Sequence, residues 1–185
     1  MQETRPGSVT LVLGGARSGK SRYAQQLAEQ SRHVVFVATA KASDEEMRAK
    51  IERHREDRPK EWPTVEEPLD LPKVLAEHEL KSEVIVVDCL TIFAANLLDT
   101  EGEDNNDAIE RRVEALCEAL RAAQCDVVLV SNEVGSGVVP AYPVGCRYRD
   151  LLGEINQKVA RVADDVVLMV AGLPLALKGH VEVTL

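Results

Sequence analysis

The sequence predicts an α/β fold in which helices flank a central, largely parallel sheet. Five short apolar runs recur along the chain, and continuous runs of this kind are typical of strands buried on both faces. Segments with apolar residues at helical spacing lie between several of them. The chain has 185 residues, of which 45% are hydrophobic, enough for one substantial core. We therefore expect a single domain spanning residues 1–185.

The expected strands cover residues 9–13, 33–38, 84–88, 126–131 and 165–170. Ala24, Leu27 and Ala28 predict a helix shortly after the first strand. Apolar positions from Tyr148 to Val162 predict a longer amphipathic helix before the fifth strand. A final apolar run at residues 181–185 is a candidate edge strand. Strands that alternate with helices in this way favour a parallel sheet.

Composition limits the function classes. The formal net charge of −9 disfavours binding to nucleic acid or to an anionic membrane, since both need a positive surface. The first eight residues lack a signal-peptide pattern, and the longest apolar stretch, residues 166–177, is too short to cross a bilayer. The four cysteines lack metal-ligand spacing, so we expect reduced, mostly buried thiols. The expectation is a cytoplasmic protein that acts on small molecules.

The segment LGGARSGKS, at the end of the first strand, has the pattern of a phosphate-binding loop. Gly14 and Gly19 are separated by four residues, and a lysine and a serine follow, between a strand and a helix. Backbone N–H groups and a helix N-terminus then point at phosphate oxygens. Lys20 is expected to neutralise the β and γ phosphates, and Ser21 to hold Mg²⁺. A glycine-rich turn that contains Lys-Ser by chance is the disfavoured alternative. The predicted nucleotide-binding residues of this loop are Gly14, Gly15, Ala16, Arg17, Ser18, Gly19, Lys20 and Ser21.

The segment VIVVDCLT places a carboxylate at the end of the third strand. Asp88 can orient the water shell of Mg²⁺ there, at the edge where open α/β sheets bind their ligands. Alternatively, Asp88 caps the helix that follows. Beside a P-loop, the metal role is favoured.

Residues 41–62 form an unusually charged segment. Fourteen of its 22 residues are charged, seven of each sign, which ordinarily indicates a solvated helix with ion pairs between successive turns. His54 shares an apolar stripe with Met47 and Ile51, so it can be a structural core histidine. Three arginines nearby favour instead a neutral imidazole that can attack phosphorus. They can also bind a triphosphate.

Together these motifs resemble those of one family, the bifunctional adenosylcobinamide kinase and adenosylcobinamide-phosphate guanylyltransferase of cobalamin biosynthesis. The resemblance covers nearly the whole chain. It rests on LGGARSGKSRYA, VATA, DEEMRAKIERHREDRP, DCLTIFAANLL, SNEVGSGVVP, RYRDLLGEINQKVA and VAGLPLALKG, in the family's order and spacing. It implies a fold similar to RecA-like P-loop proteins and a homotrimer. The implied substrates are ATP, GTP, adenosylcobinamide and its phosphate, with Mg²⁺ as cofactor.

The resemblance also implies a covalent step. His54 matches the family's guanylylated histidine, which attacks the α phosphorus of GTP, expels pyrophosphate and becomes a phosphoramidate. In the kinase half, the hydroxyl of adenosylcobinamide takes the γ phosphate of ATP or GTP. The new phosphate then attacks the GMP on His54, which gives adenosylcobinamide-GDP. Further nucleotide contacts are implied at Ala38, Thr39, Ala40, Arg55, Glu56, Asp57, Arg58, Glu66 and Asp88.

Glu133 is a third candidate catalytic residue, after Lys20 and His54. It follows the fourth strand, in a glycine-rich loop at the ligand-binding edge of the sheet. With Asn132 it is expected to orient the substrate hydroxyl or a metal-bound water. The alternative is that both residues only hold the loop in place.

Two other function classes are compatible with a P-loop. A plain small-molecule kinase would need residues 14–21 and Asp88 but would have no use for His54. A regulatory nucleotide switch would need a partner surface, of which the sequence gives no apolar signal. Transfer of GMP onto the protein distinguishes the bifunctional kinase and guanylyltransferase from both alternatives.

Overall fold

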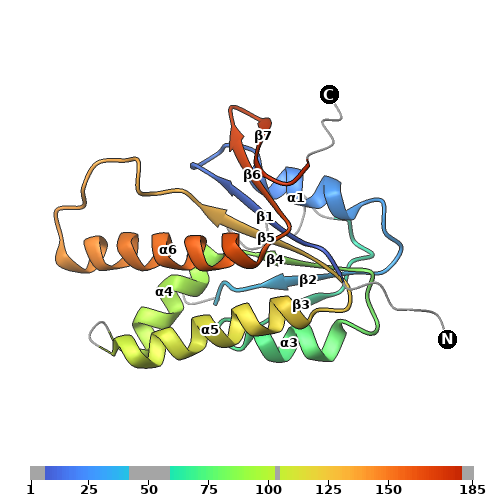
Figure 1. The fold of residues 1–185 in the computed structure, drawn as a ribbon, viewed down its shortest axis with the longest axis horizontal. Coiled ribbons are helices and arrows are strands. Elements are labelled where there is room, and N and C mark those ends of the chain that lie inside the picture. Colours follow the sequence, from blue (N-terminus) through green and yellow to red (C-terminus); the bar gives the residue numbers. More distant parts are fainter. Residues whose placement is uncertain (1–6, 42–58, 103–104, 181–185) are drawn as a thin grey trace.

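The structure is a computed structural model, and it describes residues 7–41, 59–102 and 105–180. Within these residues the strands form one seven-stranded sheet in the order β3-β2-β4-β5-β1-β6-β7, with β7 antiparallel to β6 and the other pairs parallel (Figure 1). The strands are β1 Val9–Gly14, β2 Val34–Ala38, β3 Thr64–Glu66, β4 Val84–Asp88, β5 Asp126–Asn132, β6 Asp165–Val170 and β7 Leu173–Lys178. The helices are α1 Lys20–Ala28, α3 Leu71–His78, α4 Leu90–Glu101, α5 Asn106–Ala122 and α6 Pro143–Val162.

The five predicted strands are confirmed, with small shifts at their ends. β1 and β5 each extend one residue further than expected, because Gly14 and Asn132 still pair with each other. The predicted long helix begins earlier, at Pro143, where the fixed φ of proline suits the first helical position. The edge strand beside β6 is β7, and the run at 181–185 lies outside the described residues.

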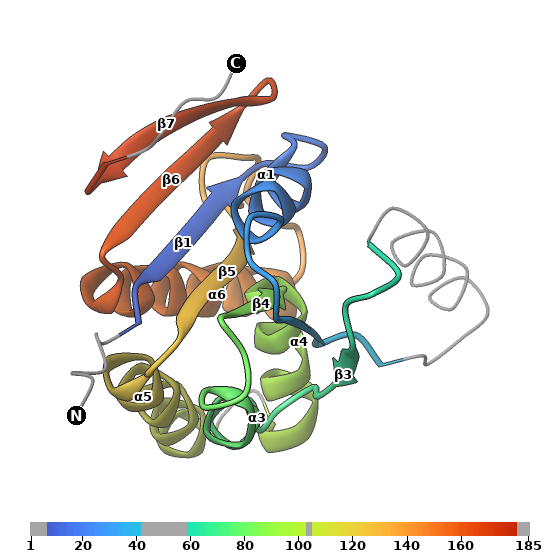
Figure 2. The same cartoon turned by 90° about the vertical axis from the view of Figure 1, so that its right-hand side faces the viewer.

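The apolar core lies on both faces of the sheet. Figure 2 shows α1 on one face, and α3, α4, α5 and α6 on the other. Phe93 and Leu97 of α4 and Leu152 of α6 are fully buried on the larger, four-helix side. Tyr23 and Ala24 of α1 pack against the opposite face. Burial on both faces is why the central strands contain continuous apolar runs.

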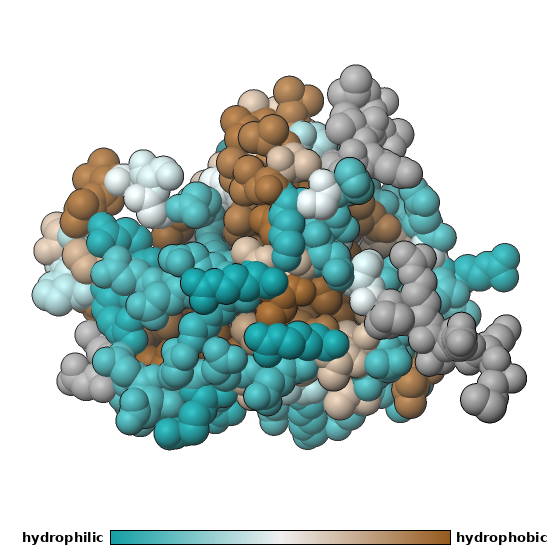
Figure 3. All heavy atoms as spheres, viewed as in Figure 1, coloured by the Kyte–Doolittle hydropathy of each residue, from teal (hydrophilic) through white to brown (hydrophobic). Residues whose placement is uncertain are grey.

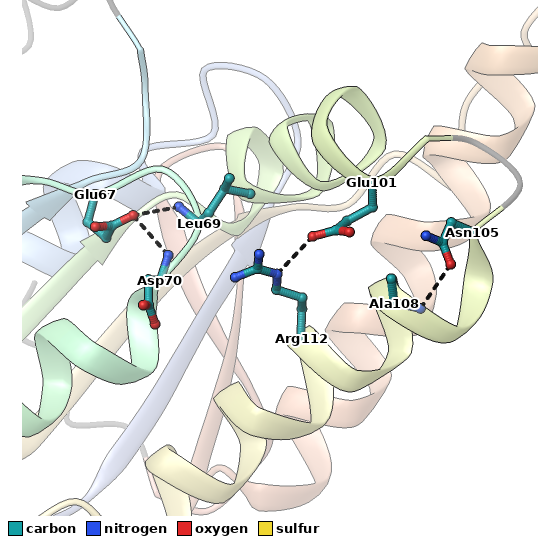
Figure 4. A network of polar contacts seen from close by, with 7 residues as sticks. All are labelled: Glu67, Leu69, Asp70, Glu101, Asn105, Ala108 and Arg112. Carbon is teal, nitrogen blue, oxygen red and sulfur yellow. Dashed lines mark hydrogen bonds and ion pairs between the residues drawn. The ribbon is translucent and has the colours of Figure 1, made fainter.

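Polar contacts fix the ends of the helices on the larger side (Figure 4). Asp70 caps α3 by accepting from the backbone N–H of Lys73, and Asn105 caps α5 by accepting from Ala108. Arg112 of α5 donates to Glu101, the last residue of α4, at 3.0 Å. These contacts hold α4 and α5 together across their connection.

All four cysteines are free, but two of them are buried where most were expected to be. Cys117 and Cys125 are buried, while Cys89 and Cys146 are partly exposed. Burial raises the pKa of the Cys89 thiol to about 11, so this thiol is protonated at neutral pH.

Candidate functional site

The register of the sheet brings most predicted site residues to one edge. Ala38, at the end of β2, pairs with Glu66 of β3 on one side and with Asp88 of β4 on the other. Gly14, at the end of β1, pairs with Asn132 of β5. On β5 the partner of Asp88 lies two residues before Asn132, so the two sets form a stepped row along one edge, on strands about 4.8 Å apart. The row is at the carboxyl edge, where open parallel sheets bind ligands.

The loop between β1 and α1 has the backbone geometry of a P-loop. Gly19 has φ +94°, a conformation that favours glycine, and it precedes the first residue of α1. A Cβ on Gly14 would lie 2.3 Å from Ser18 Oγ and 2.9 Å from the carbonyl oxygen of Met169, so this position has no room for a side chain. Arg17 also has positive φ, at 55°. The chain thus turns tightly enough to present its N–H groups ahead of the helix.

The turn between β6 and β7 supports the loop from behind. The N–H of Gly172 donates to the carbonyl of Ser18 at 3.0 Å. On the other side of β1, just after β5, the N–H of Glu133 donates to the carbonyl of Gly14 at 3.1 Å. The side chain of Ser18 is buried, and its hydroxyl has no hydrogen-bond partner within the described part of the chain. Both contacts use carbonyls of the P-loop. The N–H of Ser18 donates within the loop to the carbonyl of Gly15 at 3.4 Å, and the preceding N–H groups of the loop can face a ligand.

Lys20 lies over this loop. Its Nζ donates to the carbonyl oxygen of Gly15 at 2.9 Å. Burial lowers the pKa of Lys20, and the negative charge of Asp88 opposes that shift, which places the two charges within electrostatic reach. A cation in this position can neutralise phosphate oxygens bound by the loop.

Ser21 and Asp88 offer oxygen ligands at the same sheet edge as Lys20. Ser21 lies in the first turn of α1, and Asp88 is the last residue of β4; both are partly exposed. Mg²⁺ is commonly held by one or two protein oxygens together with phosphates and water, so this pair fits it. Within the described ranges no cluster of three or more His, Cys, Asp or Glu forms an all-protein metal site. Asp88 is not the cap of α4: the N-cap is Cys89, and no side chain bonds there.

Thr39 connects β2 to β4 next to Asp88. Its side chain is fully buried, and its hydroxyl accepts from the N–H of Cys89 at 2.9 Å and donates to the Cys89 carbonyl at 2.8 Å. Asn96 of α4 donates to the carbonyl of Thr39 at 2.8 Å. The Thr39 hydroxyl thus binds the backbone of Cys89 rather than a ligand. Its neighbours in the chain, Ala38 and Ala40, lie at the carboxyl edge of the sheet.

Replacement of Thr39 by valine is expected to lower the free energy of unfolding by about 2–3 kcal/mol, because it leaves both polar groups of Cys89 without the hydroxyl. Urea unfolding of the purified protein measures this. Thr39→Ser is the matched control: it keeps the hydroxyl and loses one methyl, at a cost of about 1 kcal/mol. Equal losses in the two variants would show that the hydroxyl is unimportant.

A buried polar network that the sequence reading did not identify fixes the end of β5. Ser131 donates to Oδ1 of Asn156 at 2.6 Å, and Nδ2 of Asn156 donates to the carbonyl of Asn132 at 3.0 Å. The N–H of Asn132 donates to Oγ1 of Thr91 at 2.9 Å. The sequence signals that could have indicated this network are Asn156, a polar residue within the amphipathic helix, and Thr91, shortly after Asp88. This network sets the direction in which the chain leaves β5.

Glu133 is the first residue after β5 and is exposed beside the P-loop. One carboxylate oxygen accepts from the N–H of Gly135 at 2.7 Å, which steadies the glycine-rich loop. Among the residues that the structure describes, the second oxygen takes part in no hydrogen bond, so it can face a ligand. Both predicted roles, loop support and orientation of a substrate group, are compatible with this geometry.

The remaining predicted residues fall into two groups. Glu66 is exposed at the outer end of the row. His54, Arg55, Glu56, Asp57 and Arg58 lie outside the described residues, as does the helix expected around them. Their roles stay predictions.

Solved structures with the same fold identify the fold class. The chain is similar to a protein of Pyrococcus horikoshii (PH0250), with a TM-score of 0.59 and 11% identity, covering 96% of this chain and 89% of that one. It is also similar to an ATPase of a bacterial type III secretion system, with a TM-score of 0.58 and 10% identity, covering 88% of this chain and 51% of that one. At such identities the likeness concerns the fold alone. The sheet, its flanking helices and the loop together give the fold of a P-loop NTPase, as the family resemblance implied.

Sequence comparison then gives the family. The family model for cobinamide kinase / cobinamide phosphate guanyltransferase matches residues 10–177. A bifunctional adenosylcobalamin biosynthesis protein of Pseudomonas aeruginosa, CobP, is 44% identical over 171 residues, covering 92% of this chain and 97% of the relative. The corresponding CobU protein of Escherichia coli is 38% identical over 178 residues, covering 91% of this chain and 98% of the relative. The chain therefore belongs to this family of bifunctional enzymes. Within the described residues, no helix combines the length and apolar character that a membrane span requires.

Proposed function

We propose that the protein phosphorylates the aminopropanol hydroxyl of adenosylcobinamide and then transfers GMP from GTP to the resulting phosphate. The observation that carries the proposal is the juxtaposition of Lys20, Asp88 and Glu133 at one sheet edge, in a chain that matches the family over residues 10–177. The proposal includes a guanylylated His54, a homotrimeric assembly and a cytoplasmic location, all carried over from the family resemblance.

In the kinase half, the residues at the sheet edge bind and polarise the triphosphate. The P-loop N–H groups and Lys20 hold the β and γ phosphates and stabilise the charge that develops during transfer. The substrate hydroxyl attacks the γ phosphorus, the bond to the β-phosphate oxygen breaks, and the nucleoside diphosphate leaves. Glu133 orients the hydroxyl and accepts its proton. Ser21 and Asp88 would hold Mg²⁺, which supplies charge neutralisation to the phosphates.

In the transferase half, the imidazole of His54 attacks the α phosphorus of GTP and pyrophosphate leaves. The phosphate of adenosylcobinamide phosphate then attacks the histidine-bound phosphorus. The P–N bond breaks, His54 is regenerated, and adenosylcobinamide-GDP forms. The arginines that follow His54 in the sequence support binding of the triphosphate.

The direct test supplies adenosylcobinamide with ATP labelled at the γ phosphate, or with GTP labelled at the α phosphate. We expect labelled adenosylcobinamide phosphate in the first reaction. With unlabelled ATP also present, the second should give labelled adenosylcobinamide-GDP. Addition of EDTA should stop both transfers, since the phosphates then lose their metal. A protein that transfers the γ phosphate but never GMP would be a plain kinase, contrary to the proposal.

Glu133→Gln is expected to slow the kinase step by roughly 100-fold, because an amide cannot accept the proton of the substrate hydroxyl. The amide oxygen can still accept from the N–H of Gly135, so the loop keeps its support. Initial rates with γ-labelled ATP measure the effect, and circular dichroism checks the fold. If both half-reactions ran at wild-type rates in this variant, Glu133 would have only a loop-supporting role.

A further inference from the structure

The loop between β5 and α6, residues 133–142, exposes large apolar side chains next to the candidate site. Val138 is 95% exposed, Val139 64% and Tyr142 73%. Figure 3 shows a small group of apolar side chains at this end of the molecule, over the loop between β5 and α6. Single exposed apolar residues are common on protein surfaces, but a group of this kind on one loop indicates a binding surface.

A hollow between α4 and α6 continues this apolar surface. Its volume is about 530 Å³, and it is lined by Ala95, Leu98, Asp99, Gly102, Val144, Gly145 and Tyr148. Val144 is 47% exposed and follows the loop directly, so the loop and the hollow share one border. Among the described lining residues, Asp99 contributes the single charged side chain. An apolar hollow with one carboxylate suits a ligand that is mainly apolar and carries positive charge or N–H groups.

Hydrogen bonds connect the hollow to the sheet edge. The hydroxyl of Tyr148 donates to the carbonyl of Thr91 at 3.3 Å, and Thr91 Oγ1 accepts from the N–H of Asn132 at 2.9 Å. Val138 is five residues beyond Glu133, so the two lie at most about 18 Å apart. A large substrate can therefore cover the loop and the hollow while a side arm reaches the P-loop.

We propose that the exposed side chains of Val138, Val139 and Tyr142, together with the hollow between α4 and α6, bind the corrin ring of the cobinamide substrate. This inference rests on the proposed function. A corrinoid is a broad ring whose rim carries methyl groups and amides, and its cobalt(III) centre gives adenosylcobinamide a net positive charge. The methyl groups fit the apolar surface, and an amide N–H can donate to Asp99. The formal net charge of −9 favours a cationic substrate.

The test is a double variant, Val138→Ser with Tyr142→Ala, which removes apolar contact area from exposed positions. Its matched control is Leu80→Ala, because Leu80 is 82% exposed and lies beyond the end of α3. We expect the double variant to raise the KM for adenosylcobinamide by about tenfold or more, with the KM for the nucleotide unchanged, since only corrin contacts are lost. Equilibrium dialysis followed by the visible absorption of adenosylcobinamide should show the same loss of affinity. The control should behave like the wild type in both measurements.

The possible results separate this inference from the proposed function. A wild-type protein that neither binds nor phosphorylates adenosylcobinamide would overturn the proposed function itself. If the wild type is active and the double variant keeps its KM and its affinity for adenosylcobinamide, the corrin ring binds elsewhere. If the double variant instead changes only the sedimentation of the protein, the surface contacts a second copy of the chain, which also overturns the inference.

Discussion

His54→Ala is expected to abolish covalent labelling of the protein by GTP labelled at the α phosphate. The imidazole supplies the protein atom to which the proposed mechanism bonds GMP, so its loss removes the acceptor from the protein. In the wild type, the label should survive denaturing electrophoresis and be released by acid, as a phosphoramidate is. GTP labelled at the γ phosphate should leave no label on either protein, because pyrophosphate carries it away.

The matched control is His78→Ala, at the last residue of α3 and away from the carboxyl edge of the sheet. It should label like the wild type. His54→Ala should keep the transfer of γ phosphate to adenosylcobinamide, because the P-loop and Asp88 are unchanged. A covalent label that persists in His54→Ala would assign the nucleophile to another residue, and a label that is absent from the wild type would leave a plain kinase as the function.

Lys20→Met is expected to slow both half-reactions by roughly 100- to 1,000-fold, the usual effect of removing one preorganised charge from a transition state. Methionine has a similar length and is apolar, so it fills the space over the loop but cannot neutralise phosphate. The loss should appear mainly in kcat, since the interaction with Lys20 strengthens as charge develops on the phosphates. Single-turnover rates with labelled ATP and GTP measure each half separately.

Lys81→Met is the matched control for Lys20, because Lys81 is an exposed lysine that precedes β4, at the opposite edge of the sheet. Its rates should equal those of the wild type. If Lys20→Met lost only the kinase half, the guanylyl transfer would not use the P-loop lysine, and the two reactions would have separate triphosphate sites.

The strands and the P-loop could be predicted because their signals are local. Central strands covered on both faces appear in the sequence as uninterrupted apolar runs. The P-loop needs glycine, lysine and serine at fixed positions within one short segment, so its pattern can be recognised without knowing the rest of the fold. β4 and β6 were therefore predicted to the residue. β7 was not predicted, because it is an edge strand with mostly exposed side chains and has Pro174 near its start.

The polar network behind the site could not be predicted, because its partners are far apart in the sequence. Thr39 bonds to Cys89 and Asn96, and Asn156 bonds to Ser131 and Asn132. None of these side chains belongs to a local motif that indicates a partner. The same holds for the row at the sheet edge: each member ends its own strand, and only the strand order shows that Glu66, Ala38 and Asp88 are neighbours.

The support of the P-loop by the turn between β6 and β7 has a consequence for how the protein is made. The loop lies near the start of the chain, yet the strands that flank β1 are β5 and β6, and Ser18 is bonded to Gly172. During synthesis, the ribosome releases the N-terminal strand long before these partners exist. The nucleotide site is thus completed among the last parts of the molecule, and a truncated chain that stops before Gly172 would carry the whole motif without the neighbour that holds it in place.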